Sequence, residues 1–236
     1  MSLLKEVIQR NEFESIRVNT EISGLVRGLE GTIVETDGFP ASVGSICEID
    51  SLDDYRTSAE VIGFRNNRNL VALHNTDTKL KVGARVRLID EGVNIRVGEN
   101  LLGRVIDGMG CPLDGKKLAK LDDSWPLNGK AVNPLDRKKI DTIFDVGVRT
   151  INSIVTIGKG QRIGIIAGSG VGKSVLLQMM SKYSNSDVVV VGLIGERARE
   201  VKVMVESLLS FDKNNKIIIV AVPADRSPLL RMRGAN

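Results

Sequence analysis

The sequence has little of what most metal, redox and hydrolytic sites are built from. Its 236 residues include two cysteines, Cys47 and Cys111, and one histidine, His74. The cysteines lie far apart and form no metal-binding or redox spacing, so we expect reduced thiols in a cytoplasmic protein. With one histidine we expect neither a histidine-based metal site nor a catalytic triad. We expect His74 to be a surface or strand-end residue.

Aromatic residues and long hydrophobic runs are also scarce. Five Phe, two Tyr and one Trp do not interleave with basic clusters, which argues against a platform for stacking nucleic-acid bases. No apolar run approaches the roughly 20 residues that a membrane span needs. Residues 1–6 lack the basic region and long apolar core of a signal peptide. The net charge of +4 suits acidic partners but does not indicate nucleic acid.

The first fifteen residues predict a short amphipathic helix. Leu3, Leu4, Val7 and Ile8 fall at helical spacing with charged residues between them. Such a helix is too short to be stable alone, so its apolar stripe must dock either on this chain or on a partner.

Residues 16–92 predict a small antiparallel β-barrel. Short alternating or β-branched runs recur there, separated by turn residues, at 17–22, 31–36, 45–49, 58–63, 70–73 and 84–89. About six short strands at this spacing are typical of a barrel, which closes its own edges and can cap a following domain. No residue of this region indicates catalysis.

Residues 91–160 are punctuated by glycine and proline and predict a long ordered connection. Residues 145–154 predict a helix that leads back to a sheet. Residues 116–140 hold seven basic side chains against three acidic ones: Lys116, Lys117, Lys120, Lys130, Arg137, Lys138 and Lys139 against Asp122, Asp123 and Asp136. These residues form either a solvated face or a docking patch for acidic partners.

A glycine-rich loop follows the apolar run at residues 162–166 and precedes a helical pattern that starts near Lys173. Strand, glycine-rich loop, Lys-Ser and helix together predict a phosphate-binding P-loop. The loop consists of Ala167, Gly168, Ser169, Gly170, Val171, Gly172, Lys173 and Ser174. Its backbone N–H groups and the helix dipole favour phosphate, the lysine supplies a cation, and the serine hydroxyl can bind Mg²⁺.

The remaining pattern alternates strand and helix. Residues 187–194 and 216–222 predict buried parallel strands, and residues 200–209 predict the helix between them. Ligands of such sheets bind at the carboxyl ends of the strands, where the P-loop also lies.

A carboxylate and a guanidinium follow the strand at 187–194. Glu196 is placed to polarise a water in line with the γ-phosphate of ATP, and Arg197 to stabilise charge. The alternative is a surface ion pair that closes the strand. Asp225 is a poor candidate for the Mg²⁺ shell, because it stands beyond the next strand across a proline. Three parallel strands are few for this architecture, so we expect the chain to be the amino-terminal portion of something longer.

These motifs, in this order, resemble the type III protein-export ATPases of flagella and injectisomes, relatives of the rotary ATP synthase β subunit. The resemblance is carried by IIAGSGVGKSVLL at 165–177, VGLIGER at 191–197 and PADRSPLLRM at 223–232. LLGRVIDG at 101–108 and PLDG at 112–115 also resemble the barrel-to-core junction of this family. An alanine at position 167 is the usual residue of the export branch.

The resemblance implies a β-barrel of residues 16–92 followed by an incomplete RecA-like P-loop core at 93–236. It implies ATP hydrolysis with Mg²⁺ that drives or gates protein export. Residues 167–175, including Val175, would bind nucleotide, Ser174 would bind the metal, and Lys173, Glu196 and Arg197 would act in catalysis. The family's magnesium-shell aspartate, arginine finger, adenine pocket and C-terminal domain would lie beyond Asn236.

The same resemblance implies a homohexamer in the cytoplasm, peripherally associated with an inner-membrane export apparatus. Its partners would be a stator-like regulator at residues 1–15, chaperone–substrate complexes and the export gate, but no nucleic acid. Three alternatives stay open: a rotary proton or sodium ATP synthase subunit, a hexameric RNA translocase, and a non-catalytic nucleotide-binding module. The residues at 167–169 and 227–230 argue against the ATP synthase subunit, and the scarcity of aromatic residues argues against the RNA translocase.

Overall fold

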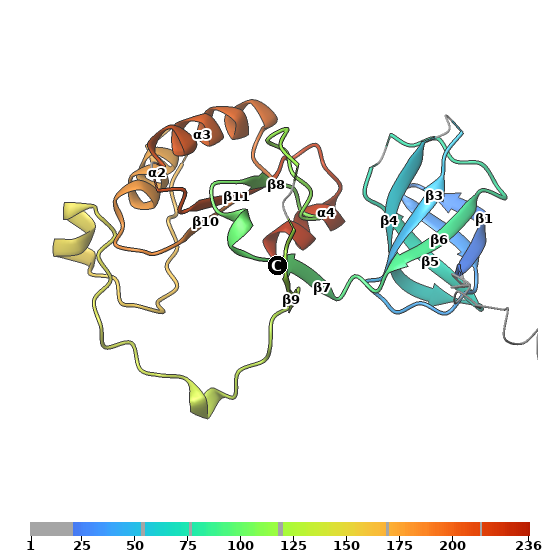
Figure 1. The fold of residues 1–236 in the computed structure, drawn as a ribbon, viewed down its shortest axis with the longest axis horizontal. Coiled ribbons are helices and arrows are strands. Elements are labelled where there is room, and N and C mark those ends of the chain that lie inside the picture. The colour runs from blue at the N-terminus through green and yellow to red at the C-terminus, as the bar shows by residue number, and fades with distance from the viewer. Residues whose placement is uncertain (1–20, 53–54, 76, 118–119, 169, 213) are drawn as a thin grey trace, which may run out of the picture.

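The structure is a computed structural model that describes residues 21–236 except 53–54, 76, 118–119, 169 and 213. An all-β unit and an α/β unit follow each other along the chain (Figure 1). The helix expected within residues 1–15 lies outside the described residues, as do Ser169 and most of the strand expected at 17–22.

The first unit is the predicted barrel, which confirms this part of the fold class. Six antiparallel strands close in the order β1-β2-β5-β4-β3-β6. Their bounds are Ser23–Glu30 (β1), Ile33–Asp37 (β2), Ile46–Asp50 (β3), Arg56–Arg65 (β4), Arg68–Leu73 (β5) and Arg85–Asp90 (β6). Five strands overlap the predicted runs. The first lies later than expected, because the chain from Ser23 pairs with both β2 and β6.

The barrel interior explains why these sequences form strands. Alternate residues point inward, as in β4, where Thr57, Ala59 and Val61 are buried and their neighbours are not. Ile49, Val71 and other inward side chains are almost fully shielded from solvent. His74 directly follows β5, as a strand-end residue, but it is 6% exposed and therefore not at the surface.

The second unit is built on a three-stranded parallel sheet in the order β10-β11-β8. The strands are Val105–Ile106 (β8), Val189–Ile194 (β10) and Ile217–Val222 (β11), and the helices are Lys173–Tyr183 (α2), Ala198–Phe211 (α3) and Pro228–Ala235 (α4). Strands β10 and β11 and helices α2 and α3 lie where the sequence predicts them. Val201 and Leu208 of α3 are buried in one cluster with the sheet residues Leu193 and Ile219.

The strand predicted at residues 162–166, just before the phosphate loop, is not formed. This segment has no strand assignment, and Ile163 and Ile166 are 45% and 99% exposed. A strand persists only where its backbone groups find partners on a neighbouring strand. Strand β11 already pairs with β10 on one side and with β8 on the other, so its two edges are taken.

The helix predicted at residues 145–154 is formed in its second half: residues 149–150 are helical and continue into a π-helical turn, Ile151–Val155 (η3), whereas residues 145–148 are not helical. The carboxylate of Asp145 accepts hydrogen bonds from Gly147 N at 2.7 Å and from Asn152 Nδ2 at 2.6 Å. These bonds hold the pKa of Asp145 below its ordinary value. A side chain that bonds the backbone in this way competes with helix formation.

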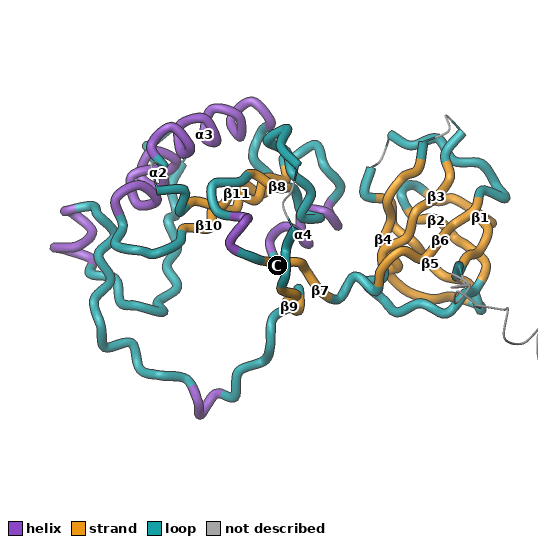
Figure 2. The backbone as a smooth tube through the Cα atoms, in the orientation of Figure 1, coloured by secondary structure: helices purple, strands orange, loops and turns teal. Residues whose placement is uncertain are grey.

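The connection between the two units carries the remaining short elements. Asn94–Val97 (β7) and Asp123–Pro126 (β9) pair with each other, and Glu99–Leu101 (η1) and Pro134–Asp136 (η2) are single 3₁₀ turns. Figure 2 shows the stretch from β9 to η3 as a long loop that swings away from the sheet. Its apex is exposed, with Leu135 91% accessible. Among the described residues, no helix combines the length and apolar character needed to cross a membrane.

Candidate nucleotide-binding site

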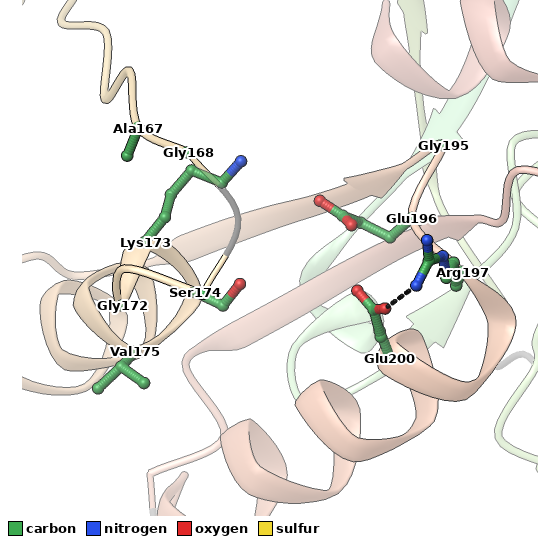
Figure 3. A pocket seen from close by; sticks show the side chains of 11 residues that line it. Ala167, Gly168, Gly172, Lys173, Ser174, Val175, Gly195, Glu196, Arg197 and Glu200 are labelled. Carbon is green, nitrogen blue, oxygen red and sulfur yellow. Dashed lines mark hydrogen bonds and ion pairs between the residues drawn. The ribbon is translucent and has the colours of Figure 1, made fainter.

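A cavity of about 600 Å³ lies between the start of α2 and the carboxyl end of β10. One wall comes from the glycine-rich loop and the first turn of α2, and the other from the turn between β10 and α3 (Figure 3). Its lining residues are Ala167, Gly168, Gly170, Gly172, Lys173, Ser174 and Val175 on one side, and Gly195, Glu196, Arg197 and Glu200 on the other. Segments about 20 residues apart in sequence therefore share one site.

The loop wall depends on glycine for its backbone. Gly170 and Gly172 have φ angles of 76° and 96°, in the left-handed region. A Cβ atom at either position would contact nothing within 4 Å, so the requirement is conformational and not steric. Gly172 caps α2 without a side-chain hydrogen bond, which leaves N–H groups of the first turn free to bind an anion.

The polar side chains of this wall are the first residues of α2. Lys173 and Ser174 are exposed to the cavity, and Val175 follows them. In Figure 3 the lysine extends back along the loop toward Gly168. Val171, which the sequence also predicts to bind nucleotide, does not line the cavity and is 67% exposed.

The opposite wall places Glu196 across from the loop. Strand β10 ends at Ile194, and Gly195, with a φ of 77°, turns the chain so that the Glu196 carboxylate points toward the loop (Figure 3). Two hydrogen bonds hold this turn to the exit of β11: Gly195 N donates to Val222 O at 2.8 Å, and Ala224 N donates to Glu196 O at 2.9 Å.

Arg197 has a partner that the sequence analysis missed. Its Nη1 lies 3.5 Å from Oε1 of Glu200, and Glu200 lines the same cavity. The i,i+3 spacing at the start of the predicted helix was the available clue. Both side chains are at least half exposed, so this ion pair leaves the guanidinium free to exchange partners at little cost.

The oxygen atoms that face the cavity suit a small divalent cation held together with phosphate. Ser174 and Glu196 offer hydroxyl and carboxylate oxygens, which Mg²⁺ prefers, and Mg²⁺ uses few protein ligands beside phosphates. Asp225 lies in an exposed turn outside the cavity, as expected for a residue with a turn role. The described residues hold no group of three or more His, Cys, Asp or Glu that could bind a metal by themselves.

Comparison with known proteins identifies a family model and several relatives that match this chain. The model of the ATP synthase alpha/beta family, nucleotide-binding domain, matches residues 147–236. The chain is 39% identical to the flagellum-specific ATP synthase of Pseudomonas aeruginosa, over 95% of this chain and 51% of that protein. It is 43% identical to the flagellum-specific ATP synthase of Salmonella typhimurium, over 87% of this chain and 47% of that protein.

Solved structures show the same fold. The assembled ATPase EscN, in complex with its central stalk EscO from the type III secretion system of enteropathogenic E. coli, matches with a TM-score of 0.78 and 35% identity. That match covers 90% of this chain and 52% of the EscN chain. The chain thus spans about half the length of the curated relatives it matches.

Proposed function

Since this chain is a relative of the type III protein-export ATPases over almost its whole length, we propose that it carries the phosphate-binding loop and the catalytic carboxylate of an ATPase that drives or gates protein export. The observation that carries the proposal is the shared cavity. Glu196 faces Lys173 and Ser174 across it, and this arrangement supports a role for the carboxylate in in-line attack of water on a γ-phosphate.

Each residue has a distinct role in this proposal. The backbone N–H groups of residues 167–175 and the Lys173 ammonium bind the phosphates of ATP. Glu196 accepts a proton from the attacking water and orients it. Arg197 leaves Glu200 to stabilise the charge that develops on the γ-phosphate. The Ser174 hydroxyl holds Mg²⁺, which neutralises phosphate charge when it is bound.

Two substitutions in the natural full-length protein test these roles. We expect Lys173→Ala to abolish ATP turnover. We expect Glu196→Gln to keep ATP binding while the hydrolysis rate falls by about 10²–10⁴-fold, the range attributed to a positioned general base. Initial rates of phosphate release and the binding of a fluorescent ATP analogue measure the two effects. Glu206→Gln, on the exposed face of α3 and outside the cavity, is the matched control.

Hydrolysis at the wild-type rate by Glu196→Gln would show that the carboxylate is not the base. The nearest alternative is a catalytic subunit of a rotary ATP synthase, which the family model also covers. Copurification with a membrane rotor would favour that alternative, and copurification with export components would favour the proposal.

The proposal extends to assembly and location. EscN is described as assembled and in complex with a central stalk, which supports a homohexamer with a stalk partner for this protein as well. We place it in the cytoplasm, peripheral to the inner-membrane export apparatus, with chaperone–substrate complexes and the export gate as partners. Residues 1–15 would bind a stator-like regulator, residues 16–92 would form the barrel domain, and residues 93–236 would form the junction and the ATPase core.

A further inference from the structure

Helix α4 lies on the side of the α/β unit that faces the barrel (Figure 1). It packs against the ends of β10 and β11 very closely. A Cβ atom on Gly234 would come within 2.6 Å of Val222 Cγ2 and 3.2 Å of Ile194 Cδ1. Because only glycine permits this approach, α4 is tightly fixed relative to the two strand ends that border the nucleotide cavity.

The segment that leads into α4 also holds the backbone of Glu196. Ala224, between β11 and α4, donates its N–H to the carbonyl of Glu196 at 2.9 Å. The Arg231 guanidinium of α4 lies beside Gly195, with Nη1 4.0 Å from the position of a Cβ there. Its Nε is buried and has no hydrogen-bond partner among the described residues. Any shift of α4 therefore reaches the turn that carries Glu196.

On another side of the same helix, Arg233 reaches the barrel. Residues two apart on a helix do not share a face, so Arg231 and Arg233 diverge. Arg233 Nη1 donates to Gly92 O at 3.2 Å and lies 3.8 Å from Oε2 of Glu60, on β4. The two side chains are 9% and 14% exposed. Arg233 thus joins α4 to a barrel strand and to the chain that links the two units.

On the barrel side of this contact, the Glu60 carboxylate would lack a charged partner without Arg233. Glu60 Oε2 lies 3.5 Å from His74 Nε2, and neither atom has a hydrogen bond among the described residues. The other ring nitrogen of His74 lies 2.9 Å from Ser58 Oγ. A buried carboxylate is costly unless a cation compensates it, and Arg233 supplies that cation.

We propose that Arg233 is a positioning residue for ATP hydrolysis. It seats α4 on the barrel through Glu60 and Gly92, and α4 with its leading segment fixes the backbone that carries Glu196. In this proposal the barrel caps the core and also helps to fix the position of the Glu196 carboxylate. This inference rests on the role proposed above for Glu196.

Steady-state kinetics of the full-length protein test it. We expect Arg233→Met to lower kcat by about 5–100-fold, the usual scale of coupling between sites. We expect the affinity for a fluorescent ATP analogue to stay within about threefold, because no α4 residue lines the nucleotide cavity. Glu60→Gln should lower kcat similarly, and Glu60→Gln with Arg233→Met should cost less than the sum of the two singles, because both act on one contact.

Two further variants separate positioning from simple loss of folding. Arg233→Lys keeps the charge but loses the two-pronged geometry, so it should recover part of kcat and should fold even if Arg233→Met does not. Arg65→Met, an exposed arginine on the same strand as Glu60, is the control and should match wild type. An unchanged kcat in Arg233→Lys and Glu60→Gln, or an equal loss in Arg65→Met, would overturn the inference. Absence of ATPase activity in the wild-type protein would instead contradict the proposed function.

Discussion

The barrel and the α/β unit differ in how completely their strands are paired and their apolar side chains are buried. All six barrel strands have two neighbours, and their inward side chains form one sealed core. The α/β sheet has three strands and two open edges, and apolar side chains such as Val190 and Ile166 are 65% and 99% exposed. A closed barrel has no unpaired strand edge, whereas an open parallel sheet keeps one unpaired edge on each outer strand.

The largest expected effect compares a side chain sealed in the barrel with one left exposed in the other unit. Ile49→Ala removes a side chain that is 0% exposed and should lower the free energy of unfolding by about 2–5 kcal/mol. Ile166→Ala should change it by less than about 0.5 kcal/mol. Urea titrations followed by circular dichroism measure both, and hydrogen exchange of the β4 amides identifies the barrel transition.

Ile49→Val, which leaves most of the side chain in place, should cost only about 0.5–1.5 kcal/mol and serves as the control. Equal losses from Ile49→Ala and Ile166→Ala would mean that the apolar run before the phosphate loop is buried in solution. The contrast between the two units would then disappear.

A smaller effect compares two Arg–Asp pairs. In the α/β unit, Arg104 donates to both Asp114 oxygens at 2.5 and 2.9 Å, and both side chains are 11% exposed. This hydrogen bonding lowers the pKa of Asp114 to about 2. In the barrel, the hydrogen bond from Arg27 also lowers the pKa of Asp37, but those side chains are 45% and 40% exposed.

We expect Asp114→Asn to cost about 1–2 kcal/mol at neutral pH and Asp37→Asn to cost less. Because the folded pKa of Asp114 lies below its unfolded value, its contribution is complete above about pH 4 and is lost as the pH falls toward 2. Unfolding titrations from pH 7 to pH 2 measure this. Added salt should weaken the Asp37 contribution more than that of Asp114. A pH-independent cost at position 114 would contradict the assignment.

The smallest effect concerns a barrel turn. Asn66 and Asn67, between β4 and β5, have φ angles of 48° and 59°, as in a two-residue hairpin turn with both residues in the left-handed region. Asn67→Ala should cost about 1 kcal/mol, because alanine tolerates this region poorly. Asn67→Gly, matched in backbone preference, should be neutral within about 0.5 kcal/mol in thermal unfolding. A neutral Asn67→Ala would show that the barrel does not depend on this turn.

The same difference between the units explains what could be predicted from the sequence. Alternation in β4 and the Asn66–Asn67 turn are local patterns, so the barrel followed from them. Glycine-rich chemistry likewise predicted the loop wall of the site, and the position of Glu196 after a buried strand predicted that it would face this loop.

The failures involve partners that lie far away in sequence. No local pattern shows that the two residues Val105 and Ile106 pair with β11, and their pairing occupies the edge of β11 that the run at 162–166 would otherwise join. The contact of Arg233 with Glu60 joins residues more than 170 positions apart, and no periodic pattern in the sequence predicts it. His74 lies at a strand end, as one of its two predicted placements has it, but nothing near it in sequence indicates its burial or the carboxylate that it meets there.

Strand β8 has a practical consequence for dissecting this protein. The family-model match begins at residue 147, yet β8, at Val105–Ile106, covers one side of β11. A fragment cut to the family boundary would keep the phosphate loop and Glu196 but would bare the hydrogen-bonding edge of its most buried strand. An exposed apolar edge of this kind recruits other chains. Expression fragments of the nucleotide-binding unit should therefore start upstream of η1, so that they include β8 and keep both edges of β11 paired.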